Sequence, residues 1–247
     1  MRDDSGGRGY GKPIVEDRFG HHWTEPDRVE EYVQRNDEEP DERAEGYKVM
    51  LSAIPFNPDH PIRVLDIGSG TGSLAAMVLD AFPNATAVGL DLSEPMMEYG
   101  RKRMARFGNR FSYHRGDFAD GNLAADLPGT FDVAVAARSI HHLPAEQKRS
   151  LYKAIYDKLN SGGAFFNVDQ VGADDDYLKG HYRHANAYMR GERPDRMVIP
   201  APRPPSPSHF WDTLPEHMSF LRDAGFTSPD CFWKRNTNTV IGGFKRP

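Results

Sequence analysis

Three glycines at alternate positions, Gly68, Gly70 and Gly72, are the residues whose spacing most directly suggests chemistry. An acid, Asp66, precedes them. Glycine lets the backbone turn tightly, and it lets a ligand approach the main chain without meeting a Cβ atom. The apolar run at 62–67 predicts a buried strand, and the apolar spacing after the glycines predicts a helix. A strand, a glycine loop and a helix in this order form the first unit of an open parallel sheet, with a ligand crevice at the carboxyl end of the strand.

The glycine spacing differs from that of two common phosphate-binding loops. The dinucleotide fingerprint G-x-G-x-x-G would need its third glycine at Ser73, and a P-loop would need a lysine after Gly72. The observed pattern, D-x-G-x-G-x-G, resembles motif I of the class I S-adenosylmethionine (SAM)-dependent methyltransferases. This resemblance implies that the three glycines shape a SAM pocket and that Asp66 helps to hold the methionine end.

A second acid ends the next predicted strand, at 85–91. Asp91 lies 25 positions after Asp66, which is close to the offset of about 20 residues at which an acid reaches the ribose of a bound nucleotide in such folds. A carboxylate can accept both ribose hydroxyls, so we expect Asp91 to bind the ribose of SAM. The alternative is that Asp91 caps the helix predicted to begin near Ser93.

The loop after the third predicted strand, at 110–115, carries Asp117 and Phe118. Alone, a Gly-Asp-Phe sequence is typical of an ordinary turn. The resemblance implies that Asp117 accepts a hydrogen bond from the exocyclic amine of adenine, with Phe118 against the ring. It also implies cofactor contacts for Leu92 and Arg138.

Two adjacent histidines follow the fourth predicted strand, at 131–136. The sequence Ile-His141-His142-Leu resembles the I-H-H-L of many small-molecule O- and N-methyltransferases. With an unperturbed pKa of about 6.5, histidine can accept a proton from a hydroxyl or ammonium group near neutral pH. Adjacent side chains point in different directions, so we expect one to face the acceptor as a base; the alternative is that they pack as helix caps. Asp169, which ends the fifth predicted strand, could orient a histidine, contact the acceptor or be a plain loop acid.

The resemblance covers roughly residues 60–245 and implies an α/β fold. Its Rossmann-like sheet would have seven strands in the order 3-2-1-4-5-7-6, with the last strand antiparallel. Cap helices at 13–60 would cover the cofactor site, and an insertion at 170–212 after the fifth strand would supply a helical lid. We therefore expect a single SAM-methyltransferase domain at 13–247, preceded by a flexible N-terminus at 1–12.

The segments around the fifth strand add three local expectations. The helix before this strand is predicted to end at a glycine cap at 160–163. In the insertion, the aspartates at 174–176, His181 and His184 look superficially like metal ligands. A solvated acidic start to a helix explains the aspartates more simply, so we expect no metal site. The proline-rich stretch at 199–207 is expected to be a stiff connector.

The composition excludes several other classes of protein. A hydrophobic content of 38% and a charged content of 27% suit a globular protein, and a net charge of −5 lacks the basic character of most nucleic-acid binders. No apolar run approaches the ~18 residues of a membrane span, and no secretory signal is visible. The single cysteine, Cys231, excludes an internal disulfide and a multi-cysteine metal site. We expect a cytoplasmic protein without nucleic-acid or membrane partners, and a homodimer is compatible with the sequence.

Together these patterns predict a SAM-dependent methyltransferase that moves a methyl group to an O or N atom of a small molecule and releases S-adenosylhomocysteine (SAH). The protein would mainly align donor and acceptor and remove a proton where needed. Two alternatives stay open. One is an RNA- or tRNA-modifying SAM enzyme, which a basic surface stripe would support. The other is a non-catalytic SAM-binding protein on the same fold.

Overall fold

The computed structural model describes residues 21–38, 43–199 and 209–247. The predicted flexible N-terminus at 1–12, and all but the first residue of the proline-rich stretch at 199–207, lie outside the described residues.

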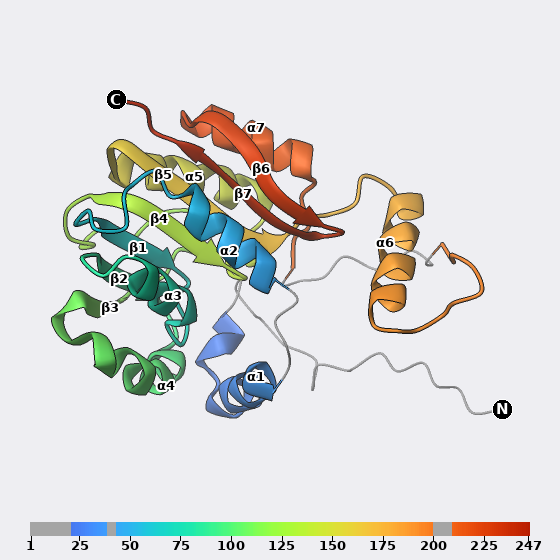
Figure 1. Ribbon diagram of the computed structural model, residues 1–247, viewed down its shortest axis with the longest axis horizontal. Helices are drawn as coiled ribbons and strands as arrows, with labels where there is room; N and C mark the ends of the chain where they lie inside the picture. The colour runs from blue at the N-terminus through green and yellow to red at the C-terminus, as the bar shows by residue number, and fades with distance from the viewer. Residues whose placement is uncertain (1–20, 39–42, 200–208) are drawn as a thin grey trace.

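The described strands form a seven-stranded sheet in the order β3-β2-β1-β4-β5-β7-β6 (Figure 1). Strands β1 to β5 pair in parallel, whereas β7 pairs antiparallel with both β5 and β6. This is the predicted order, with the predicted antiparallel strand, so the expected α/β fold is confirmed. The strands are β1 (Arg63–Ile67), β2 (Thr86–Asp91), β3 (Phe111–Arg115), β4 (Phe131–Ala137), β5 (Leu159–Gln170), β6 (Thr227–Arg235) and β7 (Asn238–Phe244).

Helices cover both faces of the sheet. Successive side chains of a strand point to opposite faces, so neighbouring residues of one strand pack into different cores. Val64 of β1 lies in a core shared with α2 (Ala44–Ala53) and α3 (Ser73–Ala81). Its neighbour Leu65 lies in a second core, with α5 (Ala145–Lys158) and α7 (Leu214–Ala224). Burial on both faces explains why the parallel strands are nearly continuous apolar runs.

The helix predicted to begin near Ser93 is confirmed, and side chains cap two of the helix starts. The hydroxyl of Ser93 accepts the N–H of Met96 at 3.2 Å at the start of α4 (Glu94–Met104). Thr213 and Glu216 form a capping box at the start of α7. The other helical segments described are η1 (His21–Thr24), α1 (Pro26–Glu38), η2 (Ala105–Arg110), η3 (Ile140–His142) and α6 (Asp176–Met189). None of the described helices is both long enough and apolar enough to cross a membrane.

The end of α5 differs from the prediction of a glycine cap at 160–163. The helix ends at Lys158, and β5 begins directly at Leu159. Leu159 is buried and pairs with Phe131 of β4, so sheet pairing begins where the glycine pattern predicts a loop. Gly162 adopts φ +84° within β5, and its N–H donates to the carbonyl oxygen of Lys245 at 2.7 Å.

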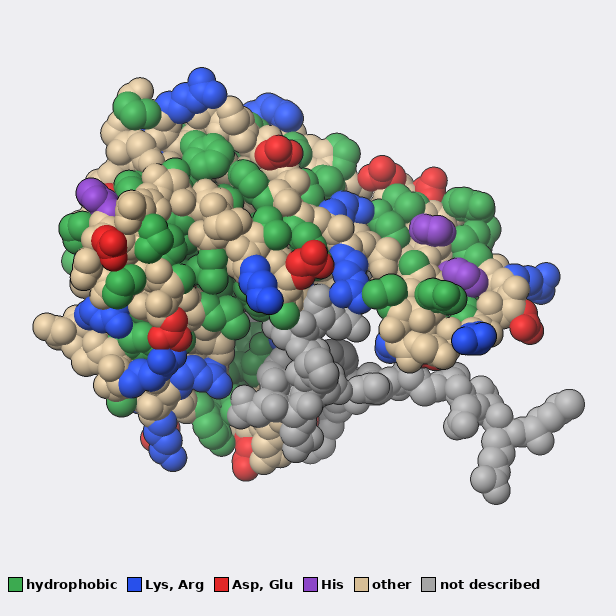
Figure 2. Space-filling model, in the orientation of Figure 1, with side chains coloured by type: hydrophobic (Ala, Val, Ile, Leu, Met, Phe, Trp, Pro, Cys, Tyr) green, Lys and Arg blue, Asp and Glu red, His purple; other side chains and the backbone are tan. Residues whose placement is uncertain are grey.

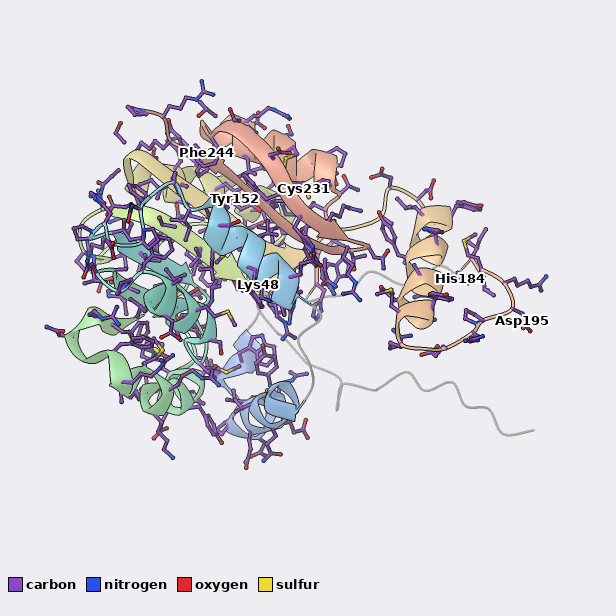
Figure 3. All side chains as sticks on the ribbon, in the orientation of Figure 1. Lys48, Tyr152, His184, Asp195, Cys231 and Phe244 are labelled. Carbon is purple, nitrogen blue, oxygen red and sulfur yellow. The ribbon has the colours of Figure 1, made fainter. Side chains whose placement is uncertain are left out.

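Helix α6 stands apart from the layered body of the molecule (Figure 1). It contacts the end of β6, where Lys234 Nζ donates to the Tyr182 hydroxyl at 2.6 Å, and the turn before β7, where Asn236 donates to the Asn186 side chain at 2.5 Å. The lobe formed by this helix, which carries His184 (Figure 3), presents hydrophobic and histidine side chains on its surface (Figure 2). The predicted helix of the insertion therefore exists, while its closure over an acceptor stays a prediction.

Candidate active site

The glycine loop joins β1 to α3 in a conformation that favours glycine. Gly68, Gly70 and Gly72 have φ angles of +68°, +54° and +74°. The N–H groups of Gly68 and Ser69 donate to the carbonyl oxygen of Leu90 at 2.8 and 3.1 Å, which ties the loop to the end of β2. A Cβ atom at Gly68 would overlap the side chain of Ser139, whereas at Gly70 it would meet nothing within 4 Å. The loop is thus packed at its start and open at Gly70.

Asp66 lies beneath the loop as a buried carboxylate. Its Oδ2 accepts the N–H of Ala75 at 3.1 Å, in the first turn of α3. Its Oδ1 has no hydrogen-bond partner among the described residues. Burial raises the pKa of Asp66 to about 7. A buried carboxylate with one unpartnered oxygen fits a cationic group, and the methionine end of SAM carries an ammonium.

Asp91 connects the glycine loop to the helix that follows β2. Its Oδ2 accepts the N–H of Gly70 at 2.6 Å, and its Oδ1 accepts the N–H of Ser93 at 2.7 Å. Burial raises the pKa of Asp91. The structure therefore shows the helix-side contact that the sequence left open as an alternative. Each oxygen keeps further acceptor capacity for a ribose hydroxyl.

The other predicted cofactor residues lie along the same edge of the sheet. Phe118 approaches Gly68, with its Cζ 3.4 Å from where a Cβ of that glycine would lie. Asp117 is exposed, and its Oδ1 accepts the N–H of Ala119 at 2.8 Å. Leu92 is half-buried. The guanidinium of Arg138 lies 5.2 Å from the ring centre of Tyr32 in α1, and the backbone of Arg138 has a left-handed φ of +56°.

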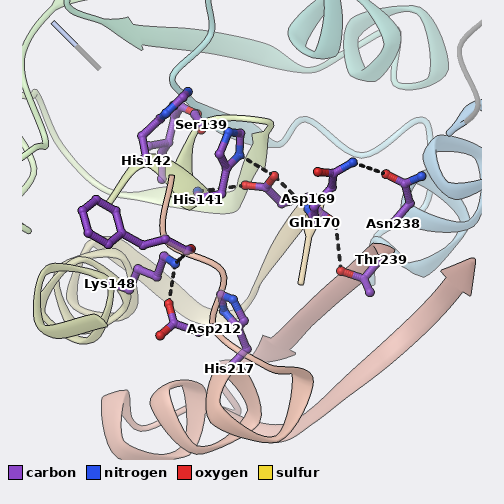
Figure 4. A network of polar contacts seen from close by, with 12 residues as sticks. Ser139, His141, His142, Lys148, Asp169, Gln170, Asp212, His217, Asn238 and Thr239 are labelled. Atoms are coloured by element: carbon purple, nitrogen blue, oxygen red, sulfur yellow. Dashed lines mark hydrogen bonds and ion pairs between the residues drawn. The ribbon is translucent and has the colours of Figure 1, made fainter. Parts of the chain in front are cut away.

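The ends of β4 and β5 bring His141 and Asp169 together (Figure 4). The Nδ1 of His141 lies 2.7 Å from Oδ1 of Asp169, and the N–H of His141 donates to Oδ2 at 3.1 Å. Burial alone would raise the pKa of Asp169, but the adjacent imidazole and these hydrogen bonds hold it well below its usual range. An ionised carboxylate on Nδ1 keeps a proton there and leaves Nε2 of His141 as the basic nitrogen. Ser139, before this turn, donates to the carbonyl oxygen of Ile67 at 2.8 Å, so the histidines lie beside the glycine loop.

His142 points to a different partner from that of His141, as expected for adjacent residues. Its Nε2 accepts the indole N–H of Trp23 at 3.3 Å. Trp23 is in turn fixed to the start of α4, because the Ser93 hydroxyl donates to its carbonyl oxygen at 2.5 Å. The N-terminal cap segment therefore covers His142.

Two aromatic residues that the sequence analysis missed complete this end of the site. The ring of His209 stacks on His141 with centroids 5.3 Å apart and planes 15° apart. The ring of Trp211 does so at 5.1 Å and 12°. The run His209-Phe-Trp211 directly after the proline-rich stretch was the pattern that could have indicated them.

Within the described ranges, one cluster of histidines has a spacing that could suit a metal ion. One ring nitrogen from each of His141, His142 and His209 lies within 4.8 Å of the other two. Zinc ligation at 2.0–2.1 Å in tetrahedral geometry puts nitrogens only about 3.3 Å apart. The Nε2 of His142 already accepts the N–H of Trp23, and the nitrogens lie farther apart than this spacing, so a shared metal would require the rings to move. The residues at 174–184 that superficially resemble metal ligands are not part of this cluster.

Comparison with known proteins identifies the family. A family model described as a methyltransferase domain matches residues 64–163. The ubiquinone/menaquinone biosynthesis C-methyltransferase UbiE of Methylobacterium nodulans is 33% identical over 190 residues, which cover 72% of this chain and 70% of that protein. The chain belongs to the class I SAM-dependent methyltransferases. As a SAM-dependent methyltransferase, it uses SAM as methyl donor.

Solved structures agree with this methyltransferase fold. Human N-acetylserotonin methyltransferase in complex with SAM is 17% identical, with a TM-score of 0.64 over 95% of this chain and 61% of that one. PigF with SAH is 20% identical, with a TM-score of 0.63 over 94% of this chain and 63% of that one. The chain thus spans less than two thirds of the length of these structural relatives.

Proposed function

We propose that this methyltransferase transfers the methyl group of SAM to an O or N atom of a small-molecule acceptor. The observation that carries the proposal is the pairing of His141 with the buried Asp169, beside the glycine loop. The names of two relatives support a small acceptor, because one acts in quinone biosynthesis and the other on N-acetylserotonin. The net charge of −5 also favours it over a polyanionic acceptor.

The residues of the loop edge would hold the donor. Asp66 would pair with the methionine ammonium, and Asp91 would accept the ribose hydroxyls. Asp117 and Phe118 would contact the adenine amine and ring. Leu92 and Arg138 would complete this pocket.

His141 would act as the general base. Bound SAM supplies a methyl group already activated by its sulfonium, for in-line displacement by the acceptor atom. As the acceptor oxygen or nitrogen attacks, Nε2 of His141 takes its proton. The imidazolium that forms would be stabilised by the ionised Asp169, which also fixes the ring. His142 is the second candidate for this role, and its contact with Trp23 places it on the side of the cap segment.

Transfer of labelled methyl from SAM into size-fractionated extract of the source organism tests this function. Asp91→Ala is the comparison at limiting SAM, because this variant should bind the donor more than about tenfold more weakly. Label in the small-molecule fraction would support the proposal, and the labelled product would reveal the methylated atom. Label only in nuclease-sensitive material would favour an RNA acceptor, and a carbon-methylated product would contradict an O or N acceptor.

A further inference from the structure

A buried lysine on α5 contacts the segment that carries His209 and Trp211. The side chain of Lys148 is fully buried. Its Nζ donates to the carbonyl oxygen of Phe210 at 2.5 Å and forms an ion pair with the carboxylate of Asp212 (Figure 4). A buried ammonium is tolerated only when it is paired and hydrogen-bonded, and these two contacts meet that condition.

The segment 209–213 is also fixed on two other sides. The N–H of Phe210 donates to the carbonyl oxygen of His141 at 2.8 Å. The N–H of Gly172, just beyond β5, donates to the carbonyl oxygen of Asp212 at 2.8 Å, and Gly172 forms a parallel bridge with Thr213. The segment therefore runs between the histidine turn, the end of β5 and α5.

Along the segment 209–212, the residues that Lys148 contacts alternate in sequence with the residues whose rings stack on His141. Lys148 holds positions 210 and 212, whereas the rings at 209 and 211 lie on His141. Lys148 therefore bonds one main-chain group and one side chain of the same short segment that carries both rings. An apolar residue at 148 could fill the same space, but it could not bond the carbonyl oxygen of Phe210 or the carboxylate of Asp212.

We propose that Lys148 is a positioning residue for the acceptor end of the site. Through Phe210 and Asp212 it holds His209 and Trp211 against His141, and it touches none of the reacting atoms. The inference rests on the proposed function only in assigning this end of the site to the acceptor.

Fluorine NMR of the full chain labelled with 5-fluorotryptophan, in the presence of SAH, tests the positioning directly. The chain has three tryptophans, Trp23, Trp211 and Trp233, whose resonances are assigned by substituting each with phenylalanine. In Lys148→Met, the Trp211 resonance should shift toward its position in the urea-unfolded chain, while the other two stay unchanged. Lys153→Met is the matched control, because Lys153 lies exposed on the same helix and pairs with Asp157.

A second variant keeps the test decisive if Lys148→Met does not fold. Lys148→Met/Asp212→Leu replaces the buried pair with apolar side chains, which commonly preserves folding. It should give the same selective shift of Trp211. Gly172→Ala should shift Trp211 as well, because the added Cβ would overlap the carbonyl oxygen of Trp211. An unmoved Trp211 resonance in the folded double variant, or equal movement of all three resonances, would overturn the proposal.

The rate of methyl transfer provides the second readout. With the small-molecule extract fraction at limiting dilution as acceptor, the double variant should lose at least tenfold in rate while its Kd for SAH stays within threefold of wild type. An unchanged rate would overturn the proposal. If wild-type enzyme labels no small molecule, the proposed function fails, and the fluorine resonances still decide whether Lys148 positions Trp211.

Discussion

The Nδ1 of His141 lies 2.7 Å from Oδ1 of Asp169, and the same carboxylate accepts the backbone N–H of His141 at 3.1 Å. One buried acid thus fixes both the ring and the main chain of the residue that we propose as base. The N–H of Gln170 also donates to Oδ1 of Asp169 at 2.9 Å, so the carboxylate itself has little freedom.

Substitution of Asp169 should therefore impair proton transfer. An amide in Asp169→Asn can donate to Nδ1, which would hold the ring in the wrong tautomer. We expect methyl transfer to fall by about 100-fold or more, the usual contribution of a general base. Isothermal titration should show an unchanged Kd for SAH, because we assign Asp169 to the acceptor end of the site. A variant as active as wild type would show that the pair does not take part in proton transfer.

Removal of the Asp91 carboxylate should weaken SAH binding by more than about tenfold, the cost of losing charge-assisted hydrogen bonds. Asp91 also holds Gly70 and Ser93, so affinity alone does not separate ribose binding from helix capping. The 2′-deoxy form of SAH separates them. Wild type should discriminate against it, and Asp91→Ala should bind both forms equally. Discrimination that survives in the variant would assign Asp91 to capping alone.

Binding of SAH should depend on pH through Asp66. Burial raises the pKa of Asp66 to about 7, so at pH 5.5 most of the unliganded enzyme has a neutral carboxyl group there. The ammonium of SAH needs the ionised form and stays protonated over this range, so the affinity should rise about tenfold or more from pH 5.5 to 7.5. Asp66→Asn should bind weakly with no such pH dependence. The same slope in wild type and variant would assign the titration to another group.

Folding stability should fall in mild acid because of His217. This buried histidine lies 2.8 Å from the hydroxyl of Tyr152, which is buried between α5 and α7, and burial lowers its pKa to about 4. Above pH 6.5 the histidine is neutral in folded and unfolded chains alike. As the pH falls from 6.5 toward 4, only the unfolded chain gains the proton, so the folded state loses stability.

Urea unfolding at pH 7.5 and 5.5 measures this effect. The expected contribution of His217 to the loss is about 1 kcal/mol between these two values. His217→Gln, which keeps a hydrogen-bond acceptor beside Tyr152, should lose correspondingly less stability than wild type over the same interval. Equal losses in the two proteins would place the titration elsewhere.

The features that could be predicted from the sequence are local in the chain. The glycine loop follows from strand, glycine and helix patterns within a few residues, and the caps at Ser93 and Thr213 follow from their own first turns. The sheet order came from the family resemblance, because strand order depends on contacts between distant segments. The misplaced end of α5 shows that pairing of Leu159 with β4 outweighs a local glycine pattern.

The end of the site that we assign to the acceptor depends on contacts that no local pattern encodes. Trp211, near the end of the insertion at 170–212, meets His141 across 70 positions of sequence. The position of Lys148 offers a clue, because its helical spacing puts it on the same face of α5 as the apolar residues Leu151 and Ile155. A lysine on an apolar face needs a buried partner, but the sequence does not show that the partner is Asp212.

The most direct test of the central claim is a single turnover of enzyme-bound labelled SAM with the small-molecule extract fraction, in wild type and His141→Gln. Our account predicts rapid appearance of a labelled O- or N-methyl product in wild type. It predicts a rate at least about 100-fold lower in the variant, with the labelled SAM still bound. Equal rates in the two proteins would contradict the role of His141. Label found only in nuclease-sensitive material would contradict the small-molecule acceptor.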